Sequence, residues 1–180
     1  MVLLKNENSL LPIPLNKKIG LIGPLADDSD APIGNWRARA NANSAISLLD
    51  GLNQAFGASN VAFEQGCKLS IGENNFHEEL KINESDTSGF MDAIDLAKRC
   101  DIVVMALGET AYMSGEGRSR SKIGLPGLQL KLLKEVFKVN KNVCTSINEW
   151  KTFNYTLGGS KHTGYFRSMA WRIKGWCSHC

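Results

Sequence analysis

The strongest constraint on the fold is an alternation of short apolar runs with amphipathic segments along most of the chain. The clearest run, residues 101–107, is apolar at every position after Asp101, which is typical of a strand buried on both faces in a parallel sheet. Shorter runs at 18–23 and 61–64 indicate two further strands. The order strand, helix, strand, helix, strand, helix therefore predicts an α/β fold, a mostly parallel sheet with helices on both faces.

Apolar spacing and capping residues predict three helices in this alternation. Ser44 is expected to cap a helix that runs to about Phe56. Thr87 or Ser88 is expected to cap the second helix, and the third covers 127–138. The residues expected to face the sheet are Ile46, Leu49 and Phe56 in the first helix, Phe90, Met91, Ile94 and Ala97 in the second, and Leu128, Leu132, Leu133, Val136 and Phe137 in the third.

The composition suits one soluble globular domain, with 180 residues, 43% of them hydrophobic and 22% charged. No apolar run reaches the roughly 18 residues that a membrane span requires, and no signal peptide is expected, so neither a membrane nor a compartment is predicted. Residues 144–180 carry a net charge of +4 and the remainder carries −1, which together give the +3 of the chain. The remainder is near neutral, and a nucleic-acid partner is therefore not expected. Cys67 and Cys100 leave open either free thiols or one disulfide.

The loop after the run at 101–107 carries the residues best suited to chemistry. It contains two carboxylates, Glu109 and Glu116, and two guanidiniums, Arg118 and Arg120. Sites in parallel α/β sheets form beyond the carboxyl ends of the strands, and a glycine on each side of Glu116 lets its side chain project freely. Glu116 is therefore a candidate general acid.

Two other interpretations of this loop stay open on the residues alone. In the first, the loop is solvated and its glutamates and arginines pair with one another. The second is a phosphate-binding loop around Gly115-Glu116-Gly117. This second interpretation is disfavoured, because the segment has neither the G-x-G-x-x-G pattern nor a Walker lysine before Ser or Thr.

Residues 144–180 break the alternation. They hold three of the four tryptophans and show no convincing period, and no further strand is predicted near Val143. We expect residues 1–143 to form the domain and residues 144–180 to be disordered or irregular. The final Cys177-Ser178-His179-Cys180 is a single C-x-x-C, which is weak evidence for a metal site without a second ligand pair. No metal and no cofactor are predicted.

Four segments, in order along the chain, carry a resemblance to a known family. They are Val2-Leu3-Leu4-Lys5-Asn6-Glu7-Asn8 with Leu10-Leu11-Pro12; Ile19-Gly20-Leu21-Ile22-Gly23-Pro24-Leu25-Ala26; Gly34-Asn35-Trp36; and Asp101 to Glu109 with Ser114-Gly115-Glu116-Gly117-Arg118-Ser119-Arg120 and Leu125-Pro126-Gly127-Leu128-Gln129. On these motifs the chain from residue 2 to about 143 resembles the C-terminal α/β domain of family 3 glycoside hydrolases, the β-glucosidase family.

The resemblance implies a site and a chemistry. A glutamate of this loop is the family's general acid/base, and by motif its position here is Glu116. The family's nucleophile is an aspartate on a preceding (β/α)8 barrel, which these residues do not include. A retaining glycosidase needs both carboxyl groups, roughly 5 Å apart. The expected protein is a fragment of a retaining β-glucosidase or β-xylosidase-like hydrolase, inactive without that barrel, with a β-linked glucoside or xyloside as substrate. The alternative is a non-catalytic carbohydrate-binding module.

The substrate-binding candidates beside Glu116 are Glu109, Trp36, Arg118 and Arg120. For Glu109 a loop-orienting role is favoured, and it is also the second choice for the general acid. The two arginines are expected to orient Glu116 or the loop rather than to touch sugar. Trp36 is equally suited to packing and to sugar contact.

The family continues after the last helix with two segments that this sequence does not show, Met/Val-Asn-Gly-Arg-Pro-Leu and Ala-Trp-His/Tyr-Gly-Gly. Codons read one nucleotide later permit the first under Asn148 to Asn154 and the second under Tyr165 to His179. In the reading frame shifted by one nucleotide, every possible choice of codons gives tryptophan at one of these positions and glycine at several others. The sequence therefore predicts that the segment 144–180 is translated out of frame.

Overall fold

A parallel sheet with strand order β2-β1-β5-β6 forms the centre of the computed structural model, which describes residues 3, 6, 9–75, 78–116, 118–122, 124–148, 153–157 and 160–164. Its strands are β1 (Ile19–Ile22), β2 (Val61–Glu64), β5 (Ile102–Gly108) and β6 (Val143–Asn148). Each neighbouring pair runs in the same direction. The predicted parallel sheet is confirmed.

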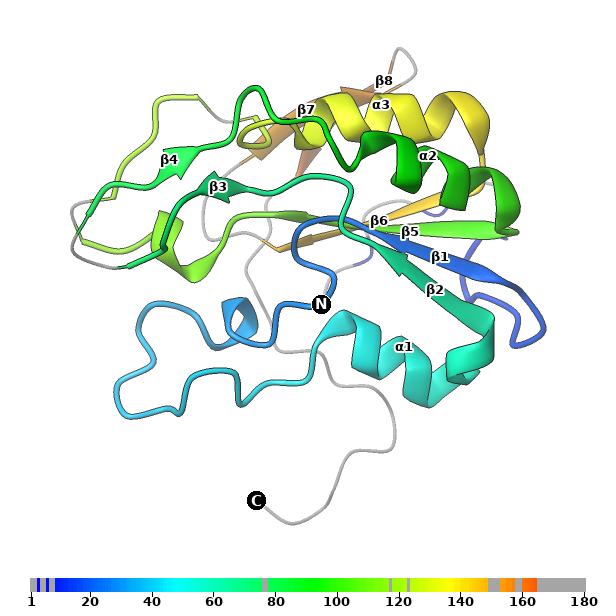
Figure 1. Cartoon of the computed structure of the whole chain (residues 1–180), viewed down its shortest axis with the longest axis horizontal. Coiled ribbons are helices and arrows are strands. Elements are labelled where there is room, and N and C mark those ends of the chain that lie inside the picture. The colour runs from blue at the N-terminus through cyan, green and yellow to red at the C-terminus, as the bar shows by residue number, and fades with distance from the viewer. Residues whose placement is uncertain are drawn as a thin grey trace.

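Helices cover both faces of this sheet, as predicted. α1 (Leu48–Phe56) lies on one face, and α2 (Phe90–Arg99) and α3 (Gln129–Val139) lie on the other (Figure 1). The remaining elements are short: the 3-10 helices η2 (Ala31–Ile33), η3 (Ala58–Asn60) and η4 (Ala111–Met113), the antiparallel pair β3 (Ser70–Ile71) and β4 (Lys81–Ile82), and the antiparallel pair β7 (Phe153–Leu157) and β8 (Ser160–Gly164).

Two helices begin later than predicted. α1 is capped by Ser47, whose hydroxyl accepts a hydrogen bond from a backbone N–H of the first turn at 3.1 Å, and not by Ser44. α2 begins after Gly89 rather than after Thr87 or Ser88. The backbone N–H of Ser88 is instead held in a turn by a carboxylate two residues earlier. Competing turns of this kind are the reason that capping residues locate helix starts only approximately.

Two residues predicted to face the sheet are exposed. Met91 points to solvent, and Ala93 and Leu96 lie in the core in its place. Ile46 precedes the first turn of α1 and is also exposed. Ile46 is exposed because α1 begins only after Ser47, whereas Met91 is exposed because the buried face of α2 follows the spacing of Phe90, Ala93 and Ala97.

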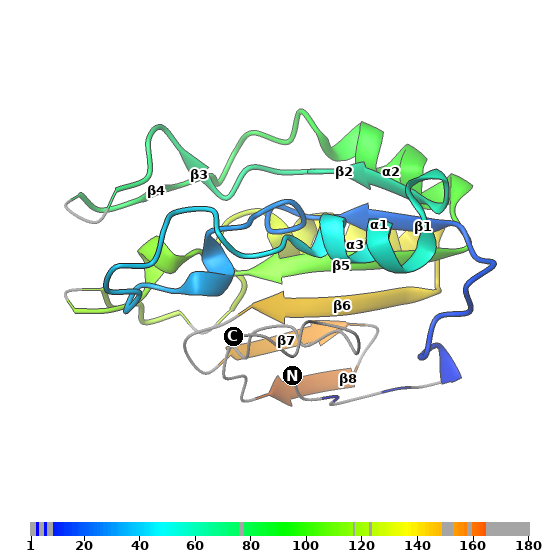
Figure 2. The same ribbon diagram turned by 90° about the horizontal axis from the view of Figure 1, so that it is seen from below.

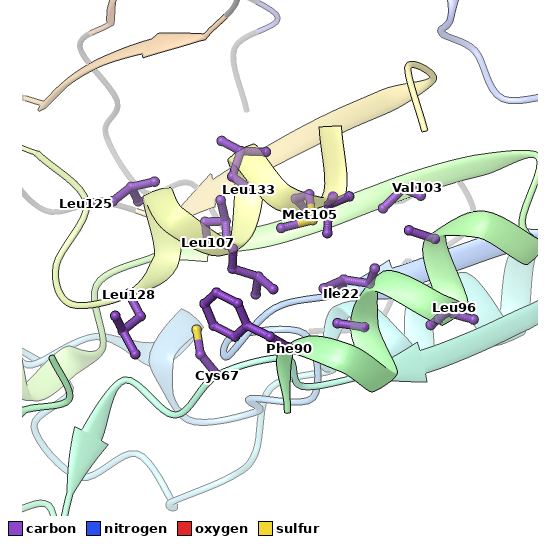
Figure 3. Packing of buried hydrophobic residues seen from close by; sticks show 14 residues of the cluster. Ile22, Cys67, Phe90, Leu96, Val103, Met105, Leu107, Leu125, Leu128 and Leu133 are labelled. Carbon is purple, nitrogen blue, oxygen red and sulfur yellow. The ribbon is translucent and has the colours of Figure 1, made fainter. Parts of the chain in front are cut away.

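The core consists of two apolar layers, one on each side of the sheet. The layer beneath α2 and α3 combines residues of the strands with residues of both helices and of the neighbouring loops (Figure 3): Ile22, Val103, Met105 and Leu107 with Cys67, Phe90, Leu96, Leu125, Leu128 and Leu133. The layer beneath α1 takes the alternate strand residues Ile19, Leu21, Val104 and Ala106. Because β5 contributes to both layers, its sequence is apolar at successive positions.

β6 is a strand that the sequence analysis does not predict, so the expectation of no strand near Val143 is wrong. The sequence Val-Cys-Thr-Ser-Ile-Asn alternates β-branched residues, which favour strands, with small polar residues and a cysteine that interrupt the apolar run. Its pairing with β5 runs from Val143 opposite Val103 to Asn148 opposite Gly108. The domain boundary at 143 and the out-of-frame tail stay predictions, and residues 177–180 lie outside the described part of the chain.

Two smaller expectations concern membranes and thiols. Among the described residues, no helix combines the length and the apolar character needed to cross a membrane. Cys67 and Cys100 are free thiols, so the disulfide left open by the sequence is not formed.

Candidate functional site

Three long connections gather at the carboxyl ends of the strands, on the same side of the molecule in both views (Figures 1 and 2). They are residues 23–47 after β1, 65–89 after β2 and 109–128 after β5. Trp36 lies on the first connection, and the predicted carboxylates and arginines lie on the third. This end of the sheet is where parallel α/β proteins place their sites.

Gln129 joins the end of β5 to the start of α3. Its side chain is fully buried, and its amide nitrogen donates hydrogen bonds to the backbone oxygens of Gly108, at 2.9 Å, and of Pro126, at 3.0 Å. Its side-chain oxygen accepts a hydrogen bond from the backbone N–H of Gly108 at 2.9 Å. The side chain of Gln129 therefore fixes both ends of the loop, where it leaves β5 and where it enters α3.

Glu109 and Arg120 form an ion pair across the base of the loop between β5 and α3. Glu109 is only 2% exposed, and its Oε1 lies 2.7 Å from an Nη of Arg120. The other Nη of Arg120 donates a hydrogen bond to the carbonyl of Gly124 at 2.9 Å. A buried carboxylate needs a paired cation, and here that cation comes from the far side of the same loop.

Glu116 lies between these two residues in sequence, and its side chain is exposed. The preceding Gly115 has a φ of 108°, a conformation that residues with a Cβ rarely adopt. A Cβ at this glycine would also overlap the side-chain amide of Asn35, so the loop lies directly against the first connection. Arg118 donates a hydrogen bond to the carbonyl of Glu78 at 2.6 Å, which ties the loop to the second connection.

Trp36 is 73% exposed and does not pack in the core. The backbone beside it is held by Arg37, whose Nε donates a hydrogen bond to the carbonyl of Gly34 at 2.8 Å and whose guanidinium forms an ion pair with Asp30. The hydrogen bond from Arg37 holds the pKa of Asp30 below its ordinary value, and the same contact raises the pKa of Arg37. A fixed loop thus presents an indole ring to solvent.

A polar hollow is lined by residues of all three connections. Residues that line it include Asp28, Asp30, Asn43, Asn74, Thr110 and Tyr112. Asp28 accepts hydrogen bonds from two backbone N–H groups at 2.8 Å, and Asp30 is paired with Arg37. The described residues contain no group of three or more His, Cys, Asp or Glu side chains arranged to bind a metal ion.

The predicted residues divide into two groups in the structure. Glu109 is buried and paired with the partly exposed Arg120, whereas Glu116 and Trp36 face solvent from neighbouring loops. Gln129 was missed, because a glutamine in a helix has no distinctive sequence pattern. Its position directly after Leu-Pro-Gly-Leu, at the start of the last predicted helix, is the sequence feature that could have indicated its role.

Comparison with known proteins identifies the family and the fold. The profile of the Glycosyl hydrolase family 3 C-terminal domain matches residues 1–156. The chain belongs to this family. The Periplasmic beta-glucosidase of Salmonella typhimurium (strain LT2) is 31% identical over 141 residues, which cover 74% of this chain and 18% of that protein. The Beta-xylosidase of Formosa agariphila is 29% identical over 150 residues, which cover 79% and 19% of the two chains.

Solved structures of family 3 enzymes show the same fold. The β-glucosidase from Listeria innocua in complex with isofagomine matches with a TM-score of 0.67 and 29% identity, over 81% of this chain and 18% of that chain. The GH3 β-glucosidase from Bifidobacterium adolescentis matches with a TM-score of 0.57 and 30% identity, over 81% of this chain and 19% of that chain. The chain spans less than a fifth of the length of these relatives. The family resemblance carried by the motifs is confirmed.

Proposed function

We propose that this family 3 domain supplies the acid/base loop of a retaining glycoside hydrolase, and that it is inactive without a partner domain. The contrast between two carboxylates carries the proposal: Glu109 is buried and paired with Arg120, whereas Glu116 is exposed. A general acid must reach the substrate. We therefore assign Glu116 as the general acid/base and Glu109 as the residue that orients the loop.

The proposed chemistry has two steps. In the first, Glu116 donates its proton to the oxygen of the glycosidic bond as that bond breaks, while a carboxylate nucleophile attacks the anomeric carbon. In the second, the ionised Glu116 takes a proton from the water that hydrolyses the glycosyl–enzyme bond, which releases the sugar and restores both carboxyl groups. The nucleophile must lie roughly 5 Å from Glu116 for this retaining reaction.

The nucleophile is proposed to come from an N-terminal (β/α)8 barrel outside these residues. Two observations support this partner: the relatives are several times longer than the chain, and Glu109, the other carboxylate of the loop, is occupied by Arg120. Because those relatives are named as a β-glucosidase and a β-xylosidase, the proposed substrate is a β-linked glucoside or xyloside. The mechanism needs no metal and no cofactor.

The other residues of the two loops have distinct proposed roles. Arg120 holds Glu109, and Arg118 anchors the loop to the carbonyl of Glu78, so both arginines position Glu116 rather than bind sugar. Trp36 is proposed to contact the substrate, because its exposed indole lies next to Asn35, which touches Gly115. Aromatic rings supply the apolar surface on which sugar rings stack.

The exposure of Trp36 also favours a second candidate, a non-catalytic carbohydrate-binding module. Calorimetric titration of the isolated chain with glucose and with xylose separates the two functions. The hydrolase proposal expects no measurable binding and no cleavage of aryl β-glucosides or β-xylosides by the chain alone. Binding that disappears in Trp36→Ala would instead establish the module.

The assignment of Glu116 is tested by joining the domain to the barrel of a related β-glucosidase. Loss of a general acid costs about 10²–10⁴ in rate. Glu116→Ala should therefore cripple cleavage of an alkyl glycoside, whose leaving group needs a proton, far more than cleavage of an activated aryl glycoside. Added azide should restore turnover of the aryl glycoside. If Glu109→Ala behaves in this way and Glu116→Ala keeps full activity, the roles are reversed.

A further inference from the structure

The outer edge of β6 is a surface that the proposed hydrolase chemistry does not use. Within the described residues, β6 is the last strand of the sheet, and only β5 is hydrogen-bonded to it. Figure 2 shows β7 and β8 beyond β6, on the side away from β5. β7 and β8 pair with each other in a separate sheet. The second edge of β6 therefore has no assigned strand partner in this part of the chain.

The register with β5 determines which backbone groups face outward. The N–H of Val103 donates to the carbonyl of Asn142 at 2.9 Å, and the N–H of Glu109 donates to the carbonyl of Asn148 at 2.9 Å. In a parallel ladder, alternate residues direct both their N–H and their C=O to the same neighbour. Cys144, Ser146 and Asn148 thus face β5, and the backbone groups of Val143, Thr145 and Ile147 point away from it.

This edge has none of the usual devices that prevent strand pairing. Edge strands are commonly protected by a charged side chain, a proline or a bulge. Residues 143–148 include no charged residue and no proline, and their register with β5 is unbroken. All of them are only partly buried. Among the described residues, therefore, nothing in this strand prevents pairing with a further strand.

We propose that this edge pairs with β6 of a second copy of the chain, antiparallel, about a two-fold axis at Thr145. The strand is self-complementary in this register. Val143 lies opposite Ile147 of the other copy, Thr145 lies opposite its own counterpart, and every outward N–H and C=O finds a partner. A shift of the register leaves some of these groups unpaired. The interface is isologous, as two-fold symmetry requires.

Side chains reinforce this register. Val143 and Ile147 both pack against the core layer beneath α2 and α3 and so lie on the same face of the sheet. Pairs of β-branched residues opposite each other stabilise antiparallel strands, and no like charges meet across the axis. Because the contact is mainly one strand on each side, the dimer is expected to be weak and to dissociate on dilution.

Charge variants at Thr145 test the register directly. Sedimentation velocity of the full chain over a wide concentration range should show a monomer–dimer equilibrium. Thr145→Lys and Thr145→Glu should each weaken the dimer by about tenfold, because like charges then face each other across the axis. An equimolar mixture of the two variants should restore association, since a lysine then lies opposite a glutamate.

Proline variants distinguish the backbone N–H groups on the outer edge of β6 from those on its inner edge, which faces β5. Thr145→Pro removes an outward N–H and should abolish the dimer while the far-UV circular dichroism spectrum stays native. Ser146→Pro removes an N–H that points to β5 and should lower the stability of the monomer itself. Thr145→Ser keeps the N–H and should dimerise like the parent chain.

Three results would overturn the proposal. They are a parent chain that stays monomeric at every concentration, a Thr145→Lys dimer with the same dissociation constant as the parent, and a Lys/Glu mixture that associates no better than either variant alone. The first is expected if the pair β7–β8 of the same chain occupies the edge. None of these results bears on the role of Glu116, because the variants change the middle of β6 and no residue of the acid/base loop.

Discussion

Loss of either side chain from the ion pair between Glu109 and Arg120 is expected to lower the stability of the folded protein. The Oε2 of Glu109 and the Nε of Arg120 are buried and have no hydrogen-bond partner among the described protein groups. The single contact of 2.7 Å between the two side chains is therefore the main compensation for burying the carboxylate. Breaking such a pair leaves an uncompensated charge in the interior.

Arg120→Met is expected to lower the free energy of unfolding by about 3–5 kcal/mol, because Glu109 stays buried without its cation. Urea unfolding followed by far-UV circular dichroism measures the loss. Lys98→Met is the matched control, since Lys98 pairs with Asp95 on an exposed surface and its removal should change stability little. Equal losses in the two variants would show that the buried pair is no more important than a surface pair.

The buried thiol of Cys67 is expected to make the stability of the protein depend on pH in the alkaline range. Burial raises the pKa of its thiol from an ordinary value of 9.0 to about 12. Between these values the folded state keeps a proton that the unfolded chain has lost. The contribution of the thiol to stability is complete below pH 9 and declines as the pH rises toward 12, by about 1.4 kcal/mol for each pH unit.

The expected result is a stability profile that falls through this alkaline window more steeply in the parent chain than in Cys67→Ala. Urea unfolding at several pH values gives both slopes. The comparison uses slopes rather than absolute stabilities, because the smaller alanine also leaves a cavity beside Phe90 (Figure 3). Identical slopes would mean that this thiol is not buried as the structure describes.

At the scale of elements, the link between β5 and α3 depends on Gln129. Gln129→Ala leaves the N–H and the carbonyl of Gly108 without their side-chain partner. We expect a loss of roughly 1–3 kcal/mol for each backbone group that remains unsatisfied. Hydrogen exchange of the Gly108 amide should accelerate as well. Lys131→Ala, on the exposed side of the same helix, is the control, and an unchanged exchange rate in Gln129→Ala would contradict the role given to this side chain.

Elements differ in how well their sequences predict them, and burial explains the difference. β5 is buried on both faces, so its apolar run is unmistakable. β6 is only partly buried, and its alternating small residues carry no such signal. The start of α1 was misplaced because Ser44 and Ser47 are chemically equivalent caps, and only the folded chain decides between them. The pattern of apolar residues therefore predicts a strand that is buried on both faces, such as β5, and misses a partly buried strand, such as β6.

The candidate site shows a similar limit. Glu116 could be proposed from its motif and its flanking glycines, because both are local features. The partners that hold the loop could not, since Asn35 and Gln129 approach it from other elements. Among the predicted residues, Arg120 was expected to orient the loop, but its pairing with Glu109 in particular required the fold.

At the scale of the whole molecule, the sheet and its two core layers end with β6. Ile147 packs against the layer beneath α2 and α3, whereas β7 and β8 pair only with each other among the described strands. Residues 144–148 of the predicted out-of-frame segment therefore belong to the sheet, and the prediction can be tested on the remaining residues, 149–180. The prediction concerns stability and is independent of any sugar or barrel.

A chain that ends at Asn148 is therefore expected to unfold with the same free energy as the 180-residue chain, within about 0.5 kcal/mol. A chain that ends at Asn142 is the matched comparison. It lacks β6, exposes the edge of β5 and loses the packing of Val143 and Ile147, so it should be destabilised by several kcal/mol. Urea unfolding at low protein concentration measures all three chains without a contribution from association. A large loss on removal of residues 149–180 alone would show that the tail is an integrated part of the domain, and the out-of-frame interpretation would then be wrong.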